Sequence, residues 1–255
     1  MAVTRDELVG VVLAAGAGTR LRPLTYERPK AMCPVGTVPL VDHALAQVTP
    51  YVADVAVNAH DSQQLLVDHV TGRAHVSVEA GERLGTAGAL GRLVRWIDGR
   101  HVLVHNADAF VDDDLDALLD GWTGEHPRLL VRTDDEPRDF GHHKHLGVSL
   151  VPARAVATFP DAPAGFYSLL WEPAWRAGTL ETVELRGHAI DCGTPADYLR
   201  ANLYVSGGDN VVDATATVEG SITRCVVWPG ARVERDEVLV DAIRTPLVTV
   251  SGAAS

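Results

Sequence analysis

The 255-residue chain is predicted to be an α/β protein with a doubly wound, mainly parallel sheet and a short C-terminal left-handed β-helix-like segment. In the first half, short β-branched runs alternate with helical patterns, as in a sheet covered by helices on both faces. A glycine-rich turn follows the first run directly. Near the C-terminus, apolar residues recur at about every sixth position, which is typical of hexapeptide-repeat coils.

The predicted elements of the first half follow one another in a regular order. The β-branched runs lie at 8–14, 52–58, 74–79 and 101–106, and the helical patterns lie at 41–48, at 62–70 and from about Thr86. In an open parallel sheet, ligands bind outside the carboxyl ends of the strands. The loops that follow the strands are therefore where functional residues are expected.

The middle of the chain, about 125–190, is less regular and is interpreted as an insertion on the substrate side of the same domain. It contains predicted strands at 128–133 and 146–152, separated by a loop rich in Asp, Pro and His. A final helix is predicted at about 195–205, followed by a break at 206–210. We therefore expect a main domain over 1–207, a β-helical tail over 208–246 and a terminal tail over 247–255.

The periodic positions of the β-helical tail are Val212, Val218, Val227 and Val233. So few coils cannot cover their own apolar face, because each repeat of a solenoid is stabilised by its neighbours. We expect the tail to bury Val218, Val227 and Trp228 against the main domain or against another subunit. A homo-oligomer formed through this tail is one possible outcome.

Composition excludes several classes of function. The formal net charge of -12 argues against binding to nucleic acids or anionic membranes, since such polyanions would be repelled. Cys33, Cys192 and Cys225 are far apart and odd in number, so we expect reduced, buried thiols. The acidic N-terminal stretch does not resemble a signal peptide and no run is long enough to span a bilayer, which favours a cytoplasmic location.

The most informative segment is LAAGAGTRLRPLTYERPKAMCPV, residues 13–35. Gly16 and Gly18 allow the backbone amides to approach a triphosphate, and Arg20 and Lys30 supply positive charge. The segment is not a dinucleotide fingerprint, which needs a glycine at Leu21. It is not a P-loop either, because Gly-Lys-Ser/Thr is absent.

The string G-A-G-T-R-L-R-P-L-T, followed by P-K, resembles the signature of the sugar-phosphate nucleotidyltransferases. The resemblance implies a Rossmann-like catalytic domain that joins a nucleoside triphosphate to a sugar 1-phosphate and releases pyrophosphate. It implies that Arg20 and Lys30 are catalytic and stabilise the charge on the departing pyrophosphate. The implied nucleotide-binding residues are Leu13, Ala14, Ala15, Gly16, Gly18, Thr19, Arg20, Glu79, Gly85 and Thr86.

The stretch from Glu79 through LGTAGAL, residues 84–90, resembles the base-binding loop of that family. Thr86 could equally cap the N-terminus of the following helix. If Glu79 faces the base, its two oxygens suit the adjacent N1 and N2 donors of guanine, which favours GTP. A solvent-exposed Glu79 is the alternative.

Asp108 and Asp191 fall on the metal-binding positions of the same family. Asp108 stands in HNADAF, where relatives carry N-G-D, and Asp191 stands in a D-x-G-T-P-x-D-Y segment. Two carboxylates at strand ends repel each other unless a cation lies between them, and Mg²⁺ prefers few carboxylates plus phosphate oxygens. The expected cofactor is therefore Mg²⁺, bound with the nucleotide.

One family element is missing. The E-K-P motif, whose lysine binds the sugar phosphate in relatives, is replaced by ATFPDAPAGFY at 157–167. The loop at 138–145, with Gly141 and Lys144, is the candidate replacement, and Arg154 is the alternative. A metal site at His142, His143 and His145 is disfavoured, because adjacent loop histidines lack the spacing of a metal site.

The favoured reading is a mannose 1-phosphate guanylyltransferase whose partners are GTP and mannose 1-phosphate. VNAH at 57–60, with LGTAGAL, also resembles uridylyltransferases that act on N-acetylated sugars. A non-catalytic relative that binds a nucleotide sugar and regulates an active partner is a third reading. A hexapeptide-repeat acyltransferase is excluded, because its active site would need more coils than this tail contains.

Overall fold

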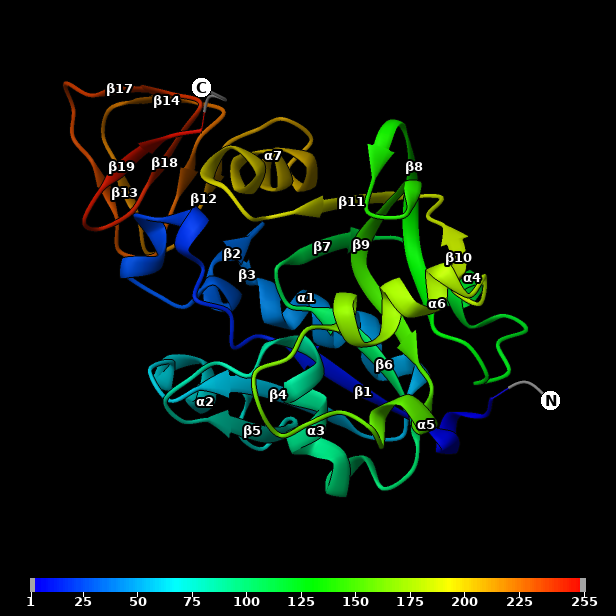
Figure 1. Cartoon of the computed structure of the whole chain (residues 1–255). Helices are drawn as coiled ribbons and strands as arrows, with labels where there is room; N and C mark the ends of the chain where they lie inside the picture. The colour runs from blue at the N-terminus through cyan, green and yellow to red at the C-terminus, as the bar shows by residue number, and fades with distance from the viewer. Residues whose placement is uncertain (1–2, 253–255) are drawn as a thin grey trace.

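A seven-stranded sheet forms the centre of the molecule (Figure 1). The computed structural model describes residues 3–252, so the ends of the predicted segments at 1–2 and 253–255 lie outside it. The strand order is β10-β8-β9-β6-β1-β4-β5. The bounds of these strands are β1 Leu8–Leu13, β4 Val55–His60, β5 His75–Glu79, β6 His101–Asn106, β8 Arg128–Arg138, β9 Gly141–Val151 and β10 Glu181–Glu184.

The sheet is mainly parallel, as predicted. β1 pairs in parallel with β4 and β6, β4 with β5, and β10 with β8, whereas β9 runs antiparallel to β6 and β8. β1 is buried along almost its whole length, because both faces of a parallel strand are covered. A side chain at Gly10 would place a Cβ 2.3 Å from the Val48 side chain, so this glycine lets a helix lie directly on the strand.

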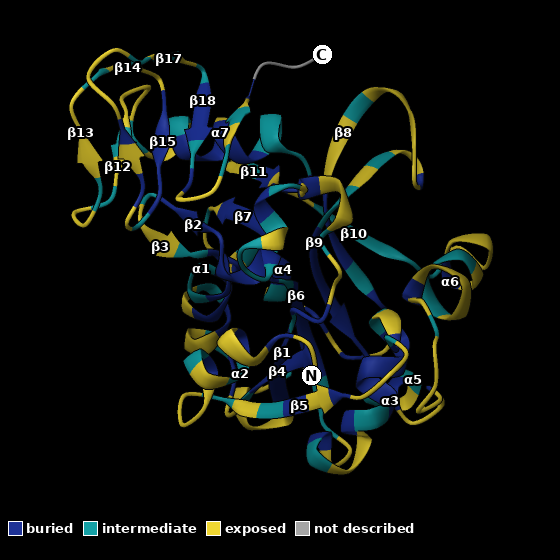
Figure 2. Ribbon diagram, turned by 90° about the vertical axis from the view of Figure 1, so that its left-hand side faces the viewer, coloured by how far each residue is buried: buried dark blue, intermediate teal, exposed yellow. Residues whose placement is uncertain are grey.

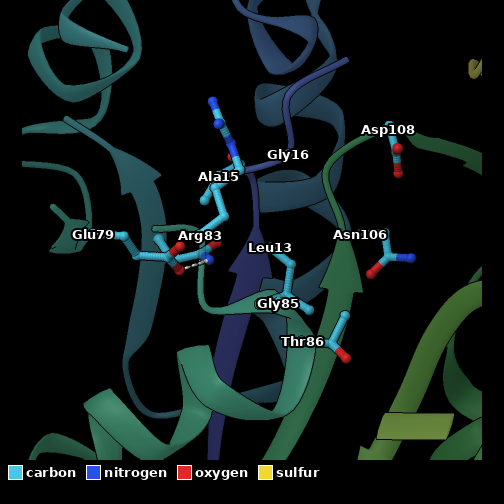
Figure 3. A pocket seen from close by; sticks show the side chains of 10 residues that line it. Leu13, Ala15, Gly16, Glu79, Arg83, Gly85, Thr86, Asn106 and Asp108 are labelled. Atoms are coloured by element: carbon cyan, nitrogen blue, oxygen red, sulfur yellow. Dashed lines mark hydrogen bonds between the residues drawn. The ribbon is translucent and has the colours of Figure 1, made fainter. Parts of the chain in front are cut away.

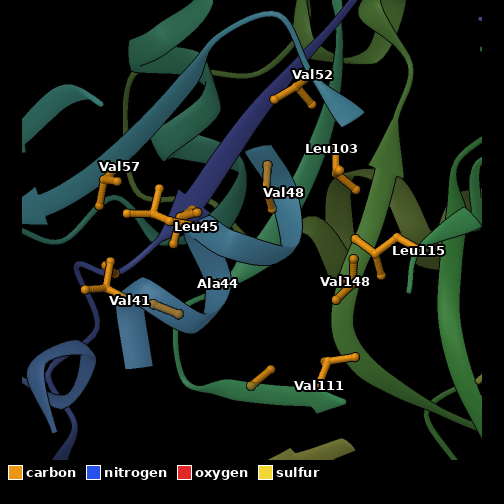
Figure 4. Close-up of a cluster of buried hydrophobic side chains, with 14 of the residues drawn as sticks. Val41, Ala44, Leu45, Val48, Val52, Val57, Leu103, Val111, Leu115 and Val148 are labelled. Atoms are coloured by element: carbon orange, nitrogen blue, oxygen red, sulfur yellow. The ribbon is translucent and has the colours of Figure 1, made fainter. Parts of the chain in front are cut away.

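Helices cover both faces of the sheet, which confirms the mixed α/β architecture. The apolar side chains of α1 (Leu40–Val48) pack on one face (Figure 4). Those of α2 (Gln64–Val70) belong to the same buried cluster. Those of α3 (Gly85–Ile97) and α5 (Ala153–Val156) pack on the other face. Figure 2 shows the buried strands between these helices. No helix within residues 3–252 is long and apolar enough to cross a membrane.

The prediction of a loop at 138–145 is wrong, because most of these residues belong to two strands. β8 and β9 are each eleven residues long and form a hairpin that projects beyond the sheet, with its tip between Arg138 and Gly141. The outer part of this hairpin is exposed, so it lacks the apolar alternation by which a half-buried strand is detected. Phe140 at the tip is buried beside Trp171 of the π-helix η6 (Tyr167–Trp171) and Trp175 of α6 (Glu172–Arg176).

Three glycines on one face of α3 lie against the loop 159–165. A Cβ at Gly85, Gly88 or Gly91 would lie 2.7, 2.2 or 2.1 Å from a backbone oxygen of that loop. The amide of Ala164 also donates to the carbonyl of Leu84, at 2.8 Å, and the amide of Ala87 donates to Ala164. The loop that replaces the missing E-K-P motif is therefore held on the helix by backbone contacts.

The C-terminal segment follows α7 (Pro195–Val205), which matches the predicted helix at 195–205. Its strands form short parallel pairs that join β12 to β15 and β15 to β18, β13 to β16, and β14 to β17, with the antiparallel β19 beside β18. Their bounds are β12 Val211–Val212, β13 Thr217–Val218, β14 Ser221–Thr223, β15 Val226–Val227, β16 Arg232–Val233, β17 Val238–Val240, β18 Ala242–Arg244 and β19 Thr249–Ser251.

This segment, residues 211–251, packs on the main domain. Val226, Trp228 and Ile243 share a buried cluster with residues of the glycine-rich segment and of α7. Val227 is buried in a separate small cluster formed by residues of 216–239 alone. The expected burial of Val218 is not seen within the chain, because this side chain is 36% exposed.

Truncation after Tyr204 is expected to lower the melting temperature by many degrees. It would remove Trp228 and Ile243 and expose the apolar side chains that they cover, and each buried large apolar side chain contributes about 1.5–3 kcal/mol. Truncation after Gly252 is the matched control, since it leaves every strand intact. Thermal unfolding of the three proteins tests this, and equal melting temperatures for all of them would contradict it.

Candidate functional site

The carboxyl ends of four parallel strands bring polar residues to one edge of the sheet. Leu13, the last residue of β1, lies opposite Asn58 of β4 and opposite Asn106 of β6. His60, the last residue of β4, lies opposite Glu79 of β5. The loops that leave these strands therefore open on one common region, as the sequence predicts.

The loop after β1 is tied back through its carbonyl groups. Gln63 Nε2 donates to the carbonyls of Ala14 and Gly16, at 3.2 and 3.3 Å, and Arg83 Nε donates to that of Ala15, at 2.7 Å. Within residues 3–252, the backbone amides of 15–18 have no intramolecular acceptor. A loop whose carbonyls are bound and whose amides are free is suited to bind an anion. Sequence reasoning did not find Gln63 or Arg83.

Gly18 is required by geometry. Its φ of +63° lies in the left-handed region, and a Cβ there would lie 2.9 Å from Thr25 Cγ2 and 3.1 Å from Lys30 Cβ. Gly16 has open space around its Cα instead. The first glycine therefore leaves the loop accessible, and the second allows the segment that carries Lys30 to approach it.

Lys30 lies between the two predicted metal-binding carboxylates. Its Nζ is 2.6 Å from Asp108 Oδ2 and 3.6 Å from Asp191 Oδ1. Arg20 Nη2 lies 3.5 Å from the other oxygen of Asp191. Lys30 is only 8% exposed, so its ammonium group is stabilised by these carboxylates. Four residues chosen from distant sequence motifs thus form one charge cluster.

A small antiparallel ladder brings the two aspartates together. β7 (Ala109–Asp112) pairs with β11 (His188–Asp191) so that Ala109 lies opposite Asp191. The amide of Cys192 donates to the carbonyl of Asp108, at 2.9 Å. Only Ala107 separates Asp108 from the end of β6, so the position of Asp108 is fixed by the main sheet and by this ladder.

A cavity of about 230 Å³ opens beside the cluster (Figure 3). Glu79 and Asp108 lie at its opposite ends, with Thr86 and Gly85 between them. Of the predicted nucleotide-binding residues, those that line it are Leu13, Ala15, Gly16, Glu79, Gly85 and Thr86, whereas Ala14, Gly18, Thr19 and Arg20 lie outside its lining.

Glu79 is buried, which rules out the solvent-exposed alternative. Its Oε1 accepts from Asn58 Nδ2 at 2.7 Å, and its Oε2 accepts from the amide of Leu84 at 2.9 Å. Asn58 Oδ1 in turn accepts from the amide of Ala14, at 2.7 Å. This network links the loop after β1 to the loop before α3, and each carboxylate oxygen keeps capacity for another donor.

Thr86 is not a helix cap. α3 begins at Gly85, and its N-cap residue, Leu84, makes no side-chain capping bond. Thr86 Oγ1 instead accepts from the amide of Phe166, at 2.7 Å. The threonine therefore fixes the loop 159–165 against α3 and presents its remaining surface to the cavity.

A second cavity, of about 440 Å³, shares Asn106 and Asp108 with the first. Arg132 and Lys144 also line it, and they lie directly opposite each other on β8 and β9. Within residues 3–252, neither makes an ion pair. Opposed like charges are unfavourable, so an anion bound between them would be stabilising. Sequence reasoning found Lys144 but missed Arg132, because the pairing depends on the hairpin register.

Gly141 and Arg154 lie away from this second cavity. Gly141 is at the hairpin tip, where a Cβ would lie 3.6 Å from Trp175. Arg154 donates to the carbonyl of Glu125. Neither residue lines either of the two cavities, whereas Lys144 does.

Burial, rather than nearby charge, dominates the pKa shifts around the site. It lowers the pKa of His105 and of His145 to about 4, so both imidazoles are neutral near pH 7. It raises the pKa of the Cys33 thiol to about 12, and it raises that of Cys192 as well. The three cysteines are free and buried, as expected. Near pH 7, the thiols of Cys33 and Cys192 are therefore protonated.

Few residues in the site could hold a metal ion. Within residues 3–252, no group of three or more His, Cys, Asp or Glu side chains is arranged to hold one, and this includes the histidines at 142–145. Asp108 and Asp191 are the carboxylates that meet at the strand ends. Two carboxylates fit Mg²⁺ only when phosphate oxygens and water complete its octahedral shell.

Comparison with known proteins places this site in context. The family model described as nucleotidyl transferase matches residues 9–164. A bifunctional protein GlmU from Methanococcus maripaludis is 25% identical over 247 residues, which cover 83% of this chain and 59% of that protein. The chain thus spans between half and three-fifths of the length of the curated relatives it matches first.

Other relatives carry different names. A mannose-1-phosphate guanyltransferase from Emericella nidulans is 26% identical, with 82% of this chain and 72% of that protein covered. An N-acetylmuramate alpha-1-phosphate uridylyltransferase from Caulobacter vibrioides is 29% identical, with 60% and 69% covered. A solved structure from Thermus thermophilus, titled mannose-1-phosphate geranyltransferase, shares the fold with a TM-score of 0.70, 16% identity and coverage of 96% and 95%.

Replacing Glu79 with glutamine is expected to lower the free energy of unfolding by about 1–3 kcal/mol. Glutamine has an amide nitrogen in place of one carboxylate oxygen, so it cannot accept hydrogen bonds from both Asn58 Nδ2 and the Leu84 amide. Glu82→Gln, at an exposed position in the loop that follows Glu79, is the matched control, and it should change stability little. Urea unfolding measures both. The network would carry no stability if the two variants unfolded at the same urea concentration.

Proposed function

The chain belongs to the nucleotidyl transferase family, and we propose that it transfers a nucleoside monophosphate unit from a nucleoside triphosphate to a sugar 1-phosphate. Pyrophosphate is the second product. The favoured substrates are GTP and mannose 1-phosphate.

The charge cluster of Lys30, Asp108, Asp191 and Arg20 is the observation that carries this proposal. It lies where the two cavities meet, since Asp108 lines both and Arg20 and Asp191 line the second. One cavity would hold the nucleoside, and the other would hold the sugar phosphate. The α-phosphate would then lie at the junction, beside the cluster.

The reaction needs positioning and charge neutralisation rather than a nucleophilic side chain. An ionised oxygen of the sugar phosphate attacks the α-phosphorus in line, and the bond to the departing pyrophosphate breaks. Arg20 and Lys30 would stabilise the charge that moves onto the pyrophosphate, and the free amides of 15–18 would bind its oxygens. No side chain is required as a general base, because the attacking oxygen of the sugar phosphate is already ionised.

Mg²⁺ is the proposed cofactor. Asp108 and Asp191 would hold it together with oxygens of the triphosphate, because this ion takes one or two carboxylates and substrate phosphates. When bound, the ion would neutralise charge on the phosphates. Lys30, which lies between the two carboxylates, balances their charge within the protein itself.

Guanine is favoured by the buried carboxylate at the end of the first cavity. Glu79 Oε1 and Oε2 each accept one bond from the protein and can each accept another, which suits the N1 and N2 donors of guanine. The same network holds Glu79 rigidly. The guanyltransferase from Emericella nidulans supports this base and mannose 1-phosphate.

A uridylyltransferase that acts on an N-acetylated sugar 1-phosphate is the second candidate. The uridylyltransferase from Caulobacter vibrioides favours it. Asn58 and His60 of the VNAH run lie at the same strand end as Glu79, so the features behind both candidates meet at one site.

For the sugar phosphate, we propose Arg132 and Lys144 in place of the missing lysine. Their unpaired charges face the second cavity from adjacent strands, and a phosphate dianion would relieve their repulsion. Gly141 is not part of this proposal, because it lies at the hairpin tip.

We propose a catalytic domain over 1–207, a tail over 208–246 and a terminal segment over 247–255, whose strand β19 returns to pair with β18 of the tail. The parallel pairs of the tail are offset by 15 to 17 residues, which supports one to two turns of a β-helix-like coil. Val238 and Val240 are 73% and 55% exposed on its outer strand, so a homo-oligomer through this tail is proposed. A cytoplasmic location stays a prediction.

Pyrophosphate release across a panel of nucleoside triphosphates and sugar 1-phosphates tests the function. We expect the fastest release with GTP and mannose 1-phosphate, and loss of activity on chelation of Mg²⁺. Release only with uridine triphosphate and an N-acetylated sugar 1-phosphate would select the second candidate. Nucleotide binding without release would select a non-catalytic relative.

Arg20→Ala and Lys30→Ala should each slow turnover by about 10²–10³, the usual effect of removing one charge-stabilising group.

The sugar-phosphate site has its own test. Lys144→Ala and Arg132→Ala should each raise the KM for the sugar phosphate by roughly tenfold to a hundredfold, since a charge-assisted contact contributes about 1.5–3 kcal/mol. The KM for the nucleotide should change little. Arg176→Gln on α6 is the control, because Arg176 pairs with Glu172 and neither residue lines either cavity. Equal changes in both KM values, or none, would remove Arg132 and Lys144 from the site.

A further inference from the structure

We infer that Trp228 and Thr245 of the C-terminal tail are positioning residues, which fix the segment that carries Lys30. The inference rests on the proposed role of Lys30. It assigns a catalytic consequence to a tail that lies outside both cavities.

The segment 23–33 is weakly held by its own backbone. It contains two short 3₁₀ turns, η3 (Leu24–Tyr26) and η4 (Lys30–Met32). In the part of the chain that the structure describes, the backbone hydrogen bonds of 23–33 run only to one another and to Leu40. No strand of the main sheet pairs with this segment, so side-chain contacts must fix it.

Two of these contacts come from the tail. The guanidinium group of Arg28 lies over the ring of Trp228, 4.3 Å from its centroid. The Arg28 Nε is buried and has no hydrogen-bond partner within residues 3–252, so the ring is the main contact of that side of the group. Thr245 is 2% exposed and donates its hydroxyl to the carboxylate of Glu27.

A third contact reaches the other end of the segment. The Trp228 Nε1 donates to the hydroxyl of Tyr198 at 2.9 Å, and that hydroxyl donates to the carbonyl of Pro34. Leu24 and Cys33 also share a buried cluster with Trp228 and Ile243. Trp228 therefore contacts the segment before Lys30 through Arg28 and after it through Tyr198.

The position of Lys30 is sensitive to small shifts. Its Nζ reaches Asp108 at 2.6 Å and Asp191 at 3.6 Å, and its side chain is almost fully buried. Displacement of a charge-stabilising group by about 1 Å can slow an enzyme by about a hundredfold. Loosening the contacts at Glu27 and Arg28 should therefore change turnover more than substrate affinity.

The test compares Arg28→Met, Arg28→Lys and Thr245→Val with Arg232→Gln, which breaks two ion pairs within the tail, and neither of them touches the segment. Hydrogen exchange is measured at the hydrogen-bonded amides of the segment, which are those of Tyr26, Glu27, Met32 and Cys33. The values of kcat and of KM for both substrates are measured as well, and urea unfolding identifies variants that fold. Arg28→Met and Thr245→Val should speed exchange and lower kcat by about three- to tenfold, with both KM values within about twofold. Arg28→Lys should recover most of kcat, and Arg232→Gln should behave as the unmodified protein.

Folded variants with unchanged exchange and unchanged kcat would overturn the inference. A higher KM for the nucleoside triphosphate, with kcat unchanged, would also overturn it and would make Arg28 a direct contact of the triphosphate. If the unmodified protein released no pyrophosphate with any substrate pair, the proposed function would fail. The exchange measurements would still decide whether the tail fixes the segment.

Discussion

The burial of one ammonium group between two carboxylates is the constraint on which the site depends. Lys30 is 8% exposed, and a buried ammonium group is stable only with close, well-oriented partners. Asp108 supplies one from the end of β6, and Asp191 supplies the other through the β7–β11 ladder. The main sheet, the small ladder and the segment 23–33 must therefore converge on one point. Gly18 permits that approach, since a side chain there would contact Lys30.

Much of this arrangement could be predicted from local sequence. The four parallel strands β1, β4, β5 and β6 are each predicted by a short β-branched run, and the loop after the first of them carries an extended string of glycines and basic residues. Because parallel strands end at one edge, loops remote in sequence had to meet. The resemblance to the nucleotidyltransferase signature singled out Arg20, Lys30, Asp108 and Asp191, and the observed ion pairs join these four residues.

What could not be predicted depends on register and on long-range partners. Arg132 faces the second cavity only because the hairpin places it opposite Lys144, and the exposed hairpin has no apolar alternation to reveal its strands. Threonine is a common helix N-cap residue, yet the hydroxyl of Thr86 accepts a hydrogen bond from the amide of Phe166, 80 residues away in the sequence. Gln63 and Arg83 act by holding carbonyls of the loop after β1, a role for which no short motif exists.

The glycine face of α3 has a consequence for how the chain can vary. Gly88 and Gly91 leave no room for even a methyl group, because the atoms in the way are backbone oxygens of Ala162 and Pro160 rather than movable side chains. The glycine face of the helix thus fixes the backbone path of the loop 159–165, whereas it does not constrain the exposed side chains of that loop. The exposed positions 162, 163 and 165 can therefore vary during evolution, whereas the backbone path of this loop can change only if the surface of α3 beneath it changes as well.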